Sequence, residues 1–129
     1  MNNDATELLQ RLLDAMNAHD PDAVVSLMAD EVSFWEPTYP EPRIGRDFVR
    51  QEMAGFFAML PDIQFQFETV AGEADAVMCE FSYAATYEGR AVRLRECSVS
   101  RLDGEGRFAE VRVYFDRLTL LRQLGMPAE

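Results

Sequence analysis

The chain has 129 residues, of which 48% are hydrophobic, and its 12 basic and 23 acidic residues give a formal net charge of −11. This length and composition predict one folded domain over residues 1–129 and exclude a disordered protein. The negative charge repels nucleic acid and anionic lipid, so we expect neither as a partner.

The residue types also bear on location and cofactors. The stretch Met1–Glu7 lacks the basic residues and the apolar run of a secretory signal, and no later run reaches membrane-spanning length. We therefore expect a cytoplasmic protein with no membrane contact, in which Cys79 and Cys97 are reduced. Because His19 is the only histidine and neither cysteine has a second ligand at finger spacing, we expect no metal site and no cofactor.

Helical spacing of apolar residues predicts three helices in the first half of the chain. The first begins at Asp4 and ends near His19, with an apolar stripe of Leu8, Leu9, Leu12, Leu13 and Met16. The second begins at Asp20-Pro21, a cap followed by a first-turn proline, and buries Val24, Val25, Leu27 and Met28. The third runs from about Arg46 to Leu60, with the apolar set Phe48, Val49, Met53, Phe56 and Phe57.

A short strand and a loop separate the second and third helices. In the strand Val32–Glu36, the side chains of Phe34 and Glu36 point to one side. The segment Pro37–Gly45 contains three prolines and is predicted to be irregular.

The second half of the chain changes to the alternation of strands. Ile63, Phe65 and Phe67 alternate with polar residues and lead to a turn over Gly72–Asp75. Three strands are then predicted, joined by turns at Glu88-Gly89 and Asp103–Gly106; they are Ala76–Tyr87, Arg90–Leu102 and Arg107–Phe115. Asp116 caps a short tail helix that ends at Leu124-Gly125.

Turn lengths predict which strand residues lie opposite each other. The turn at Glu88-Gly89 places Phe81 opposite Glu96, and the next turn places Glu96 opposite Val113 and Ser98 opposite Val111. One face of the sheet is then largely apolar and carries Cys79, Phe81, Tyr83, Leu94, Glu96, Ser98, Val111, Val113 and Phe115. The other carries a charged ladder, and we expect a homodimer through it: Glu80, Ser82, Arg93, Arg95, Glu110, Arg112 and Tyr114.

These elements predict an α+β fold with three N-terminal helices packed on a strongly curved, mostly antiparallel sheet. An apolar pocket between the layers is predicted to be lined by Leu13, Met16, Phe34, Phe56, Phe57, Phe81, Leu94, Val111, Val113 and Phe115. We expect a small apolar ligand or substrate to enter it. Two carboxylates, Glu36 and Glu96, point inward, where an unpaired charge is costly to bury and therefore calls for a partner, a shifted pKa or a task.

Four segments resemble, in order and spacing, the SnoaL-like branch of the nuclear transport factor 2-like superfamily. They are Ala18–Ala23, Leu27–Val32, Ile44–Asp47 and Val113–Asp116. The resemblance implies a cystatin-like cone, and its relatives include ketosteroid isomerases, polyketide cyclases, limonene-epoxide hydrolases and non-catalytic binding domains. It therefore indicates the fold more closely than the function.

The resemblance to ketosteroid isomerases places Glu36 at the position of their general base. Those enzymes carry Asp-Pro after the first strand and a loop ending Glu-Pro-Arg-x-Gly, and this chain has Glu36-Pro37 and Glu41–Gly45 there. Their two oxyanion donors correspond to Leu13, which cannot donate, and to Ser98, a weaker donor than a neutral acid. The resemblance thus implies that the base is kept and the oxyanion hole is largely lost.

The resemblance to epoxide hydrolases fails at the residues of their triad. Those positions correspond here to Phe81, Tyr83 and Val113, none of which is an acid or an arginine. We therefore disfavour an epoxide hydrolase. The acid that polyketide cyclases use has no clear counterpart.

Two kinds of function remain open. As an isomerase or cyclase, the protein would use Glu36 as general base, with Tyr83, Ser98 or a protonated Glu96 stabilising an enolate. Alternatively Glu36 ends a strand in water, Glu96 pairs with an arginine, and Tyr83 and Ser98 satisfy neighbours. The protein would then be a binding module for an apolar ligand or a dimeric scaffold.

Overall fold

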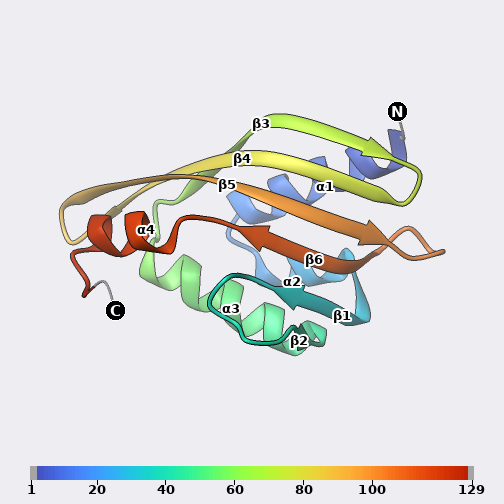
Figure 1. Ribbon diagram of the computed structural model, residues 1–129, viewed down its shortest axis with the longest axis horizontal. Coiled ribbons are helices and arrows are strands. Elements are labelled where there is room, and N and C mark those ends of the chain that lie inside the picture. The colour runs from blue at the N-terminus through green and yellow to red at the C-terminus, as the bar shows by residue number, and fades with distance from the viewer. Residues whose placement is uncertain (1–2, 128–129) are drawn as a thin grey trace.

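The computed structural model describes residues 3–127, which form an α+β fold with four helices and a six-stranded sheet. Helices α1 (Asn3–Asn17), α2 (Pro21–Ser26) and α3 (Arg46–Met59) lie on one side of the sheet, and α4 (Arg117–Leu124) sits at one end (Figure 1). The predicted fold class is confirmed. No helix in this part of the chain is long and apolar enough to cross a membrane.

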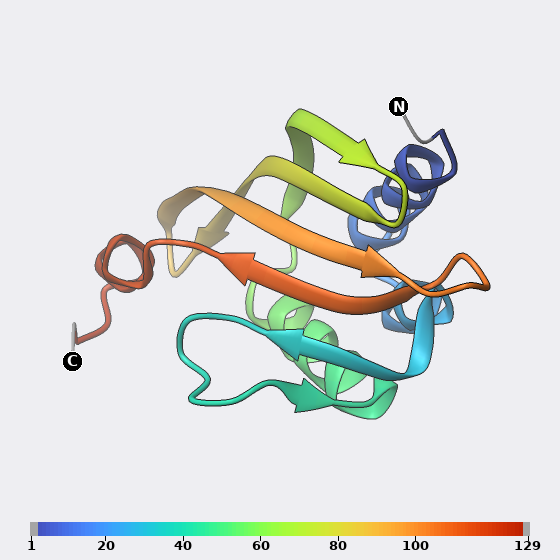
Figure 2. The same ribbon diagram turned by 45° about the vertical axis from the view of Figure 1, so that its right-hand side comes forward.

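The sheet is built around one long hairpin. Its strand order is β2-β1-β6-β5-β4-β3, and Figure 2 shows its strong twist around the helices. The strands are β1 (Met28–Trp35), β2 (Arg43–Ile44), β3 (Gln64–Glu73), β4 (Ala76–Tyr87), β5 (Arg90–Leu102) and β6 (Phe108–Tyr114). Only the β1–β6 pairing is parallel among these strands; the other four are antiparallel.

The second helix is shorter than predicted, and β1 is longer. Helix α2 ends at Ser26, and Met28, which the sequence pattern assigns to its buried face, is the first residue of β1. The reason is a tertiary hydrogen bond, because the Phe108 N–H donates to the Leu27 carbonyl at 3.0 Å and draws the chain into the sheet. Met28 is buried in either arrangement, so its hydrophobicity did not distinguish them.

The proline-rich segment is also more regular than predicted. Arg43 and Ile44 pair with Phe34 and Ser33 and form β2. The Gly45 N–H donates to the Val32 carbonyl at 2.9 Å and extends the pairing. All three prolines precede this stretch, so none removes a donor from it.

The predicted register is right for one hairpin and wrong for the next. Phe81 lies opposite Glu96, as predicted. Across β5 and β6, however, Ser98 faces Val113 rather than Val111. The turn contributes one residue of this shift, because Leu102 pairs with Phe108 rather than with Arg107, and a bulge between Arg101 and Leu102 contributes the second. Because two is an even number, every side chain keeps the face that was predicted for it.

Two side-chain amides attach helices to exposed sheet edges. The Asn17 amide accepts from the Phe65 N–H at 2.7 Å and donates to the Phe65 carbonyl at 3.0 Å, which ties the end of α1 to β3. In the same way, Gln123 of α4 accepts from the Arg93 N–H at 2.6 Å and donates to its carbonyl at 2.8 Å. Arg93 lies on β5 beyond the end of β6, so α4 covers an edge that β6 leaves open.

The two cysteines confirm the assignment of faces. Cys79 is buried and Cys97 is exposed, and both are free. Burial raises the pKa of the Cys79 thiol to about 12, with smaller contributions from Cys97 and Glu80.

Candidate functional site

A cavity of about 330 Å³ lies between the helices and the inner face of the sheet. All four predicted polar site residues line it: Glu36, Tyr83, Glu96 and Ser98. Eight of the ten predicted apolar residues do so as well: Leu13, Met16, Phe34, Phe56, Phe81, Val111, Val113 and Phe115. The inner face and the three helices therefore enclose the predicted pocket.

Phe57 and Leu94 do not line the cavity, and their assignment was wrong. Both belong to a second apolar cluster, together with Leu60, Ile63 and Leu124. Phe57 stacks on the His19 ring with centroids 4.9 Å apart. Leu94 lies in this cluster rather than in the cavity wall because Leu124 of helix α4 packs into the same cluster at that end of the sheet.

Glu36 follows directly after β1 and is half-buried in the cavity wall. Its Oε1 accepts a hydrogen bond from the Thr38 N–H at 3.1 Å, which fixes the carboxylate. Burial raises the pKa of Glu36 above its ordinary value and the Glu52 charge adds to this, while the Thr38 N–H and Arg117 oppose it. Glu36 is therefore a stronger base than a glutamate in water.

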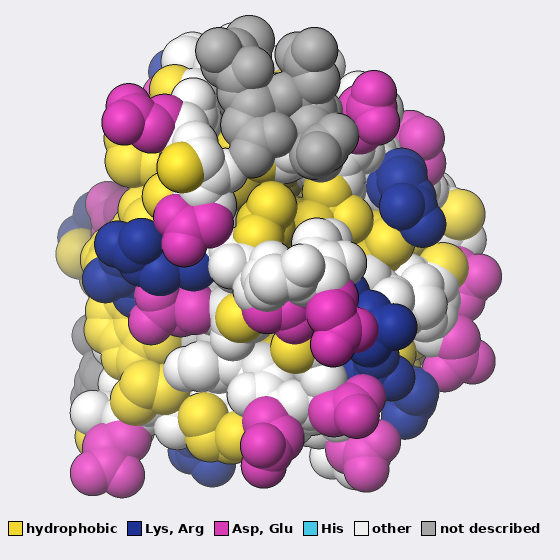
Figure 3. Space-filling view, turned by 90° about the vertical axis from the view of Figure 1, so that its right-hand side faces the viewer, with side chains coloured by type: hydrophobic (Ala, Val, Ile, Leu, Met, Phe, Trp, Pro, Cys, Tyr) yellow, Lys and Arg dark blue, Asp and Glu magenta, His cyan; other side chains and the backbone are white. Residues whose placement is uncertain are grey.

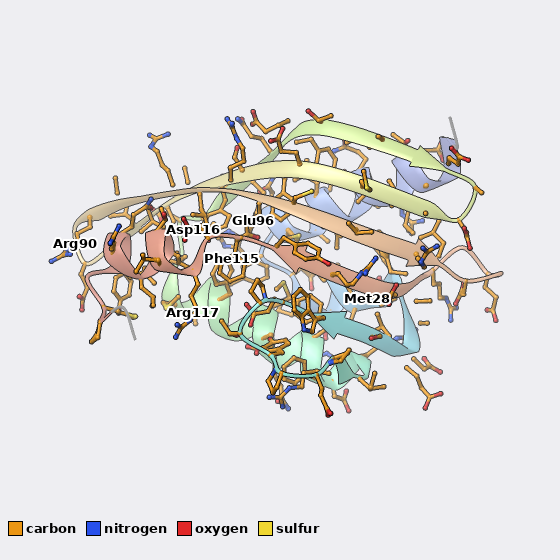
Figure 4. The ribbon with its side chains drawn as sticks, in the orientation of Figure 1. Met28, Arg90, Glu96, Phe115, Asp116 and Arg117 are labelled. Carbon is orange, nitrogen blue, oxygen red and sulfur yellow. The ribbon has the colours of Figure 1, made fainter. Side chains whose placement is uncertain are left out.

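Glu96 faces the same cavity from the middle of β5 (Figure 4). Burial raises its pKa to about 8; the Tyr83 hydroxyl opposes this shift, and the Glu36 charge adds to it. At neutral pH the Glu96 carboxyl therefore holds its proton and is a hydrogen-bond donor. The alternative of an arginine partner is not realised, because no ion pair of Glu96 occurs among the described residues.

Tyr83 lies deep in the cavity wall and is only 3% exposed. Its hydroxyl is buried and has no hydrogen-bond partner of good geometry in the described part of the chain. Burial is the main reason that its pKa is raised, followed by the nearby Glu96 charge. Tyr83 and Glu96 thus influence each other without a well-formed hydrogen bond, which leaves the phenol proton for a ligand.

Two further residues of the site, Tyr39 and Glu52, are not among the predicted site residues. The Tyr39 hydroxyl donates to Oε1 of Glu52 at 2.9 Å, and both side chains line the cavity. Burial raises the pKa of Tyr39, and Glu52 adds to the shift. Helical periodicity contained the signal for Glu52, because it shares one stripe with Val49 and Phe56. Tyr39 lies in a loop without periodicity, which folds back through a hydrogen bond from Trp35 Nε1 to the Tyr39 carbonyl.

The chemical character of the site follows from these groups. A carboxylate with enhanced basicity, a protonated carboxyl group and an unpartnered phenol share one apolar cavity. Such a set can remove a proton and donate hydrogen bonds to an oxygen. Among residues 3–127, no three His, Cys, Asp or Glu side chains are grouped so that they could hold a metal ion.

Comparison with known proteins assigns the family. The model of the SnoaL-like domain matches residues 9–111, and the chain belongs to this family within the nuclear transport factor 2-like superfamily. A candidate SnoaL-like polyketide cyclase from Jannaschia sp. CCS1 is similar in structure, with a TM-score of 0.85, 18% identity and coverage of 97% of this chain and 94% of that one.

Two other solved structures share the fold. A hypothetical protein from Catenulispora acidiphila DSM 44928 with a ketosteroid isomerase-like fold, in complex with trimethylamine, has a TM-score of 0.82, 20% identity and coverage of 95% of both chains. An M. tuberculosis LEH-like epoxide hydrolase has a TM-score of 0.77, 20% identity and coverage of 95% of this chain and 93% of that one. At these identities the likeness extends to the fold alone.

Proposed function

We propose that this protein is an isomerase or cyclase that acts on a small apolar carbonyl compound without a cofactor. The observation that carries the proposal is the pairing, in one cavity, of a basic Glu36 with a protonated Glu96 and a free Tyr83 hydroxyl. Membership of the SnoaL-like family supports it, as does the structural likeness to a candidate polyketide cyclase.

The reaction begins with transfer of a proton from carbon to the Glu36 carboxylate. The electron pair of the broken C–H bond moves to the carbonyl oxygen, and Glu96 and Tyr83 donate hydrogen bonds to the enolate that forms. Ser98, buried on the same face, is a further candidate donor. In an isomerase, Glu36 then returns the proton to another carbon. In a cyclase, the enolate carbon attacks a second carbonyl, and the new alkoxide takes the proton.

These donors come from the sheet rather than from the first helix. Leu13 of α1 lines the cavity but has no polar atom to offer. Glu96 on β5 and Tyr83 on β4 lie on neighbouring strands and take over that role, since Phe81 and Leu94 pair with Glu96 and Tyr83 across the hairpin. The proposed oxyanion site is therefore rearranged and not lost.

Epoxide hydrolysis is a less suitable chemistry for this cavity. Phe81, Tyr83 and Val113 line it where the resemblance places the hydrolase triad. No arginine belongs to the lining formed by the described residues. The remaining alternative is a non-catalytic binding module, which the mainly apolar lining also favours.

Replacement of Glu36 by Gln tests the proposal. Deuterium uptake next to the carbonyl, measured by NMR in D₂O over a panel of apolar ketones, detects proton abstraction even when the natural substrate has not been identified. Loss of the base should slow uptake by about 10²–10⁴-fold. The melting temperature should stay the same or rise slightly, since a carboxylate in a desolvated site is removed.

The matched control is Glu41→Gln, which removes the same charge from an exposed position outside the cavity lining. It should leave deuterium uptake unchanged. Undiminished uptake in the Glu36→Gln protein would refute the catalytic role. Ketones that bind to the wild-type cavity without any exchange would favour the binding module.

The pH profile of the exchange reaction tests the donor role of Glu96. Uptake should rise as Glu36 loses its proton and fall as Glu96 ionises, which happens around pH 8. The Glu96→Gln protein keeps a hydrogen-bond donor that does not titrate. Its pH profile of deuterium uptake should therefore lack the fall at alkaline pH. An alkaline limb that persists in this variant would assign the limb to another group.

A further inference from the structure

The cavity lining formed by the described residues contains carboxylic acids and no basic side chain. Among the described residues they are Glu36, Glu52 and Glu96, and no arginine joins them. The nearest basic groups lie outside this lining. The Arg43 guanidinium lies 5.3 Å from the Tyr39 ring centroid, and the charge of Arg117 is the smallest of the named influences on the pKa of Glu36. A ligand inside the cavity therefore meets the carboxylates of Glu36 and Glu52 and no basic side chain among the described lining residues.

The exposed carboxylate of Glu52 is held at the mouth of the cavity. Glu52 is exposed although it lines the cavity, and the Tyr39 hydroxyl donates to its Oε1 at 2.9 Å. This bond orients the carboxylate and leaves its second oxygen available. Two further aromatic rings lie beside Tyr39, because it contacts both Phe34 and Phe48, with ring centroids 6.1 and 5.7 Å away.

Two aromatic rings near the mouth, those of Tyr39 and Phe48, already have a cation close to them. The Arg43 guanidinium lies over Tyr39 and, at 5.5 Å, over Phe48. Ring faces attract cations through their quadrupole. An oriented carboxylate beside aromatic rings is an environment that favours the binding of an ammonium group.

The deep end of the cavity makes the opposite demand. There the Tyr83 hydroxyl is buried beside the Glu96 carboxyl without a hydrogen bond of good geometry, so its proton is available to an acceptor on a ligand. Glu52 at the mouth and Tyr83 at the deep end thus call for different groups on one ligand. Between them the wall is apolar and aromatic, with Phe56, Phe81 and Phe115 among its residues.

We propose that the cavity takes an apolar compound with a protonated amine at its mouth end, held by Glu52, and a carbonyl at its deep end, held by Tyr83. This inference rests on the proposed function in that it assigns the substrate class of the same cavity. Carboxylates, phosphates and other anions are excluded, because Glu36 and Glu52 repel them and no cation in the lining would replace their lost hydration.

Three probes of matched shape test the amine. N,N-dimethylbenzylamine is a cation at pH 7, isobutylbenzene is its neutral isostere, and phenylacetate is an anion of similar size. Binding is measured by NMR titration of the cavity resonances at low ionic strength. The amine should bind at least about 10-fold more tightly than isobutylbenzene, and phenylacetate more weakly than either. Added salt should weaken only the amine.

Two variants locate the effect. Glu52→Gln should remove most of the preference for the amine and leave the affinity for isobutylbenzene unchanged. Glu41→Gln, which removes the same charge from the loop outside the lining, should leave the preference in place. If both variants lost the preference for the amine equally, the preference would come from the overall negative charge of the protein, and the assignment to Glu52 would be overturned.

Binding and exchange fail independently in these experiments. Isobutylbenzene or phenylacetate bound as tightly as the amine would overturn the inference, and so would no detectable binding of the amine at millimolar concentration. Neither result bears on proton abstraction, which deuterium uptake in the Glu36→Gln protein measures. Conversely, selective amine binding without exchange would uphold the ligand class and refute catalysis.

Discussion

The two faces of the sheet differ in how many of their polar side chains have partners. On the outer face, several charged groups have partners, although the buried Nε of Arg112 has none among the described residues: Arg101 Nε lies 3.6 Å from Glu110 Oε1, and Ser82 donates to Glu68 Oε2 at 2.9 Å. On the inner face, Tyr83 has no partner of good geometry and Glu96 has no counterion among the described residues. The same strands, β4 and β5, supply both faces.

This difference distinguishes polar groups that interact with water and with each other at the surface from polar groups that are positioned to bind a ligand. Exposed ion pairs contribute about 0–1 kcal/mol each, and their main effect is solubility. Figure 3 shows acidic and basic side chains interspersed over the end of the molecule that it presents. An unpartnered buried hydroxyl or a desolvated carboxyl costs stability, so its presence in the wall of a cavity points to function.

The largest effect on stability is expected from a comparison of the same substitution at two neighbouring residues that point to opposite faces. Val92 is fully buried and Ala91 is exposed, and both lie on β5. Val92→Asp should lower the free energy of unfolding by about 4 kcal/mol or more, since it buries an unpaired carboxylate. Ala91→Asp should cost less than about 1 kcal/mol. Urea denaturation measures both, and similar losses would contradict the assignment of faces.

The next effect concerns the stability cost of Glu96. In the folded protein the Glu96 carboxyl keeps its proton up to about pH 8, whereas in the unfolded chain it releases the proton near the ordinary pKa of 4.5. The native state therefore binds more protons in this window, and stability falls as pH rises through it. Glu96→Gln removes the titration and should be more stable than wild type at pH 9, by about 2 kcal/mol after allowance for partial exposure.

At pH 4 the Glu96→Gln protein and the wild type should differ little, because Glu96 is protonated in both the folded and the unfolded chain. Thermal or urea unfolding at the two pH values measures the difference. A constant difference between the two proteins at both pH values would show that Glu96 titrates normally in the folded state.

The smallest effect on stability is expected for a substitution on the outer face, which should instead change the oligomeric state. Met78 and Tyr114 are 51% and 42% exposed there, and the buried Nε of Arg112 lacks a hydrogen-bond partner among the described residues. We expect these groups to meet a second copy of the chain. Met78→Arg should shift sedimentation at micromolar protein from dimer toward monomer with little change in melting temperature.

The control for assembly is Ile44→Arg, at another exposed hydrophobic residue, which lies on the edge strand β2. It should leave the dimer intact. A wild-type protein that sediments only as a monomer at micromolar concentration would refute the expected homodimer.

Local pattern was sufficient for much of the fold and for part of the site. The alternation of β4 and β5, with the turn at Glu88-Gly89, predicted their pairing residue by residue. Because that pairing also assigns the faces, it placed Tyr83, Glu96 and Ser98 in the cavity wall. Phe57 and Leu94 were misplaced, since sequence periodicity identifies a buried side but not which of two apolar clusters a residue joins.

The sequence by itself determined the α+β class, the resemblance to the SnoaL-like family and the inward direction of Glu36 and Glu96, because strand alternation and turn length are local properties. Only the tertiary structure decided that Glu36, Glu52 and Tyr39 meet at one mouth and that Tyr83 lacks a partner. These contacts join the loop after β1, helix α3 and the sheet, and the pKa values that define the chemistry arise from their shared desolvation.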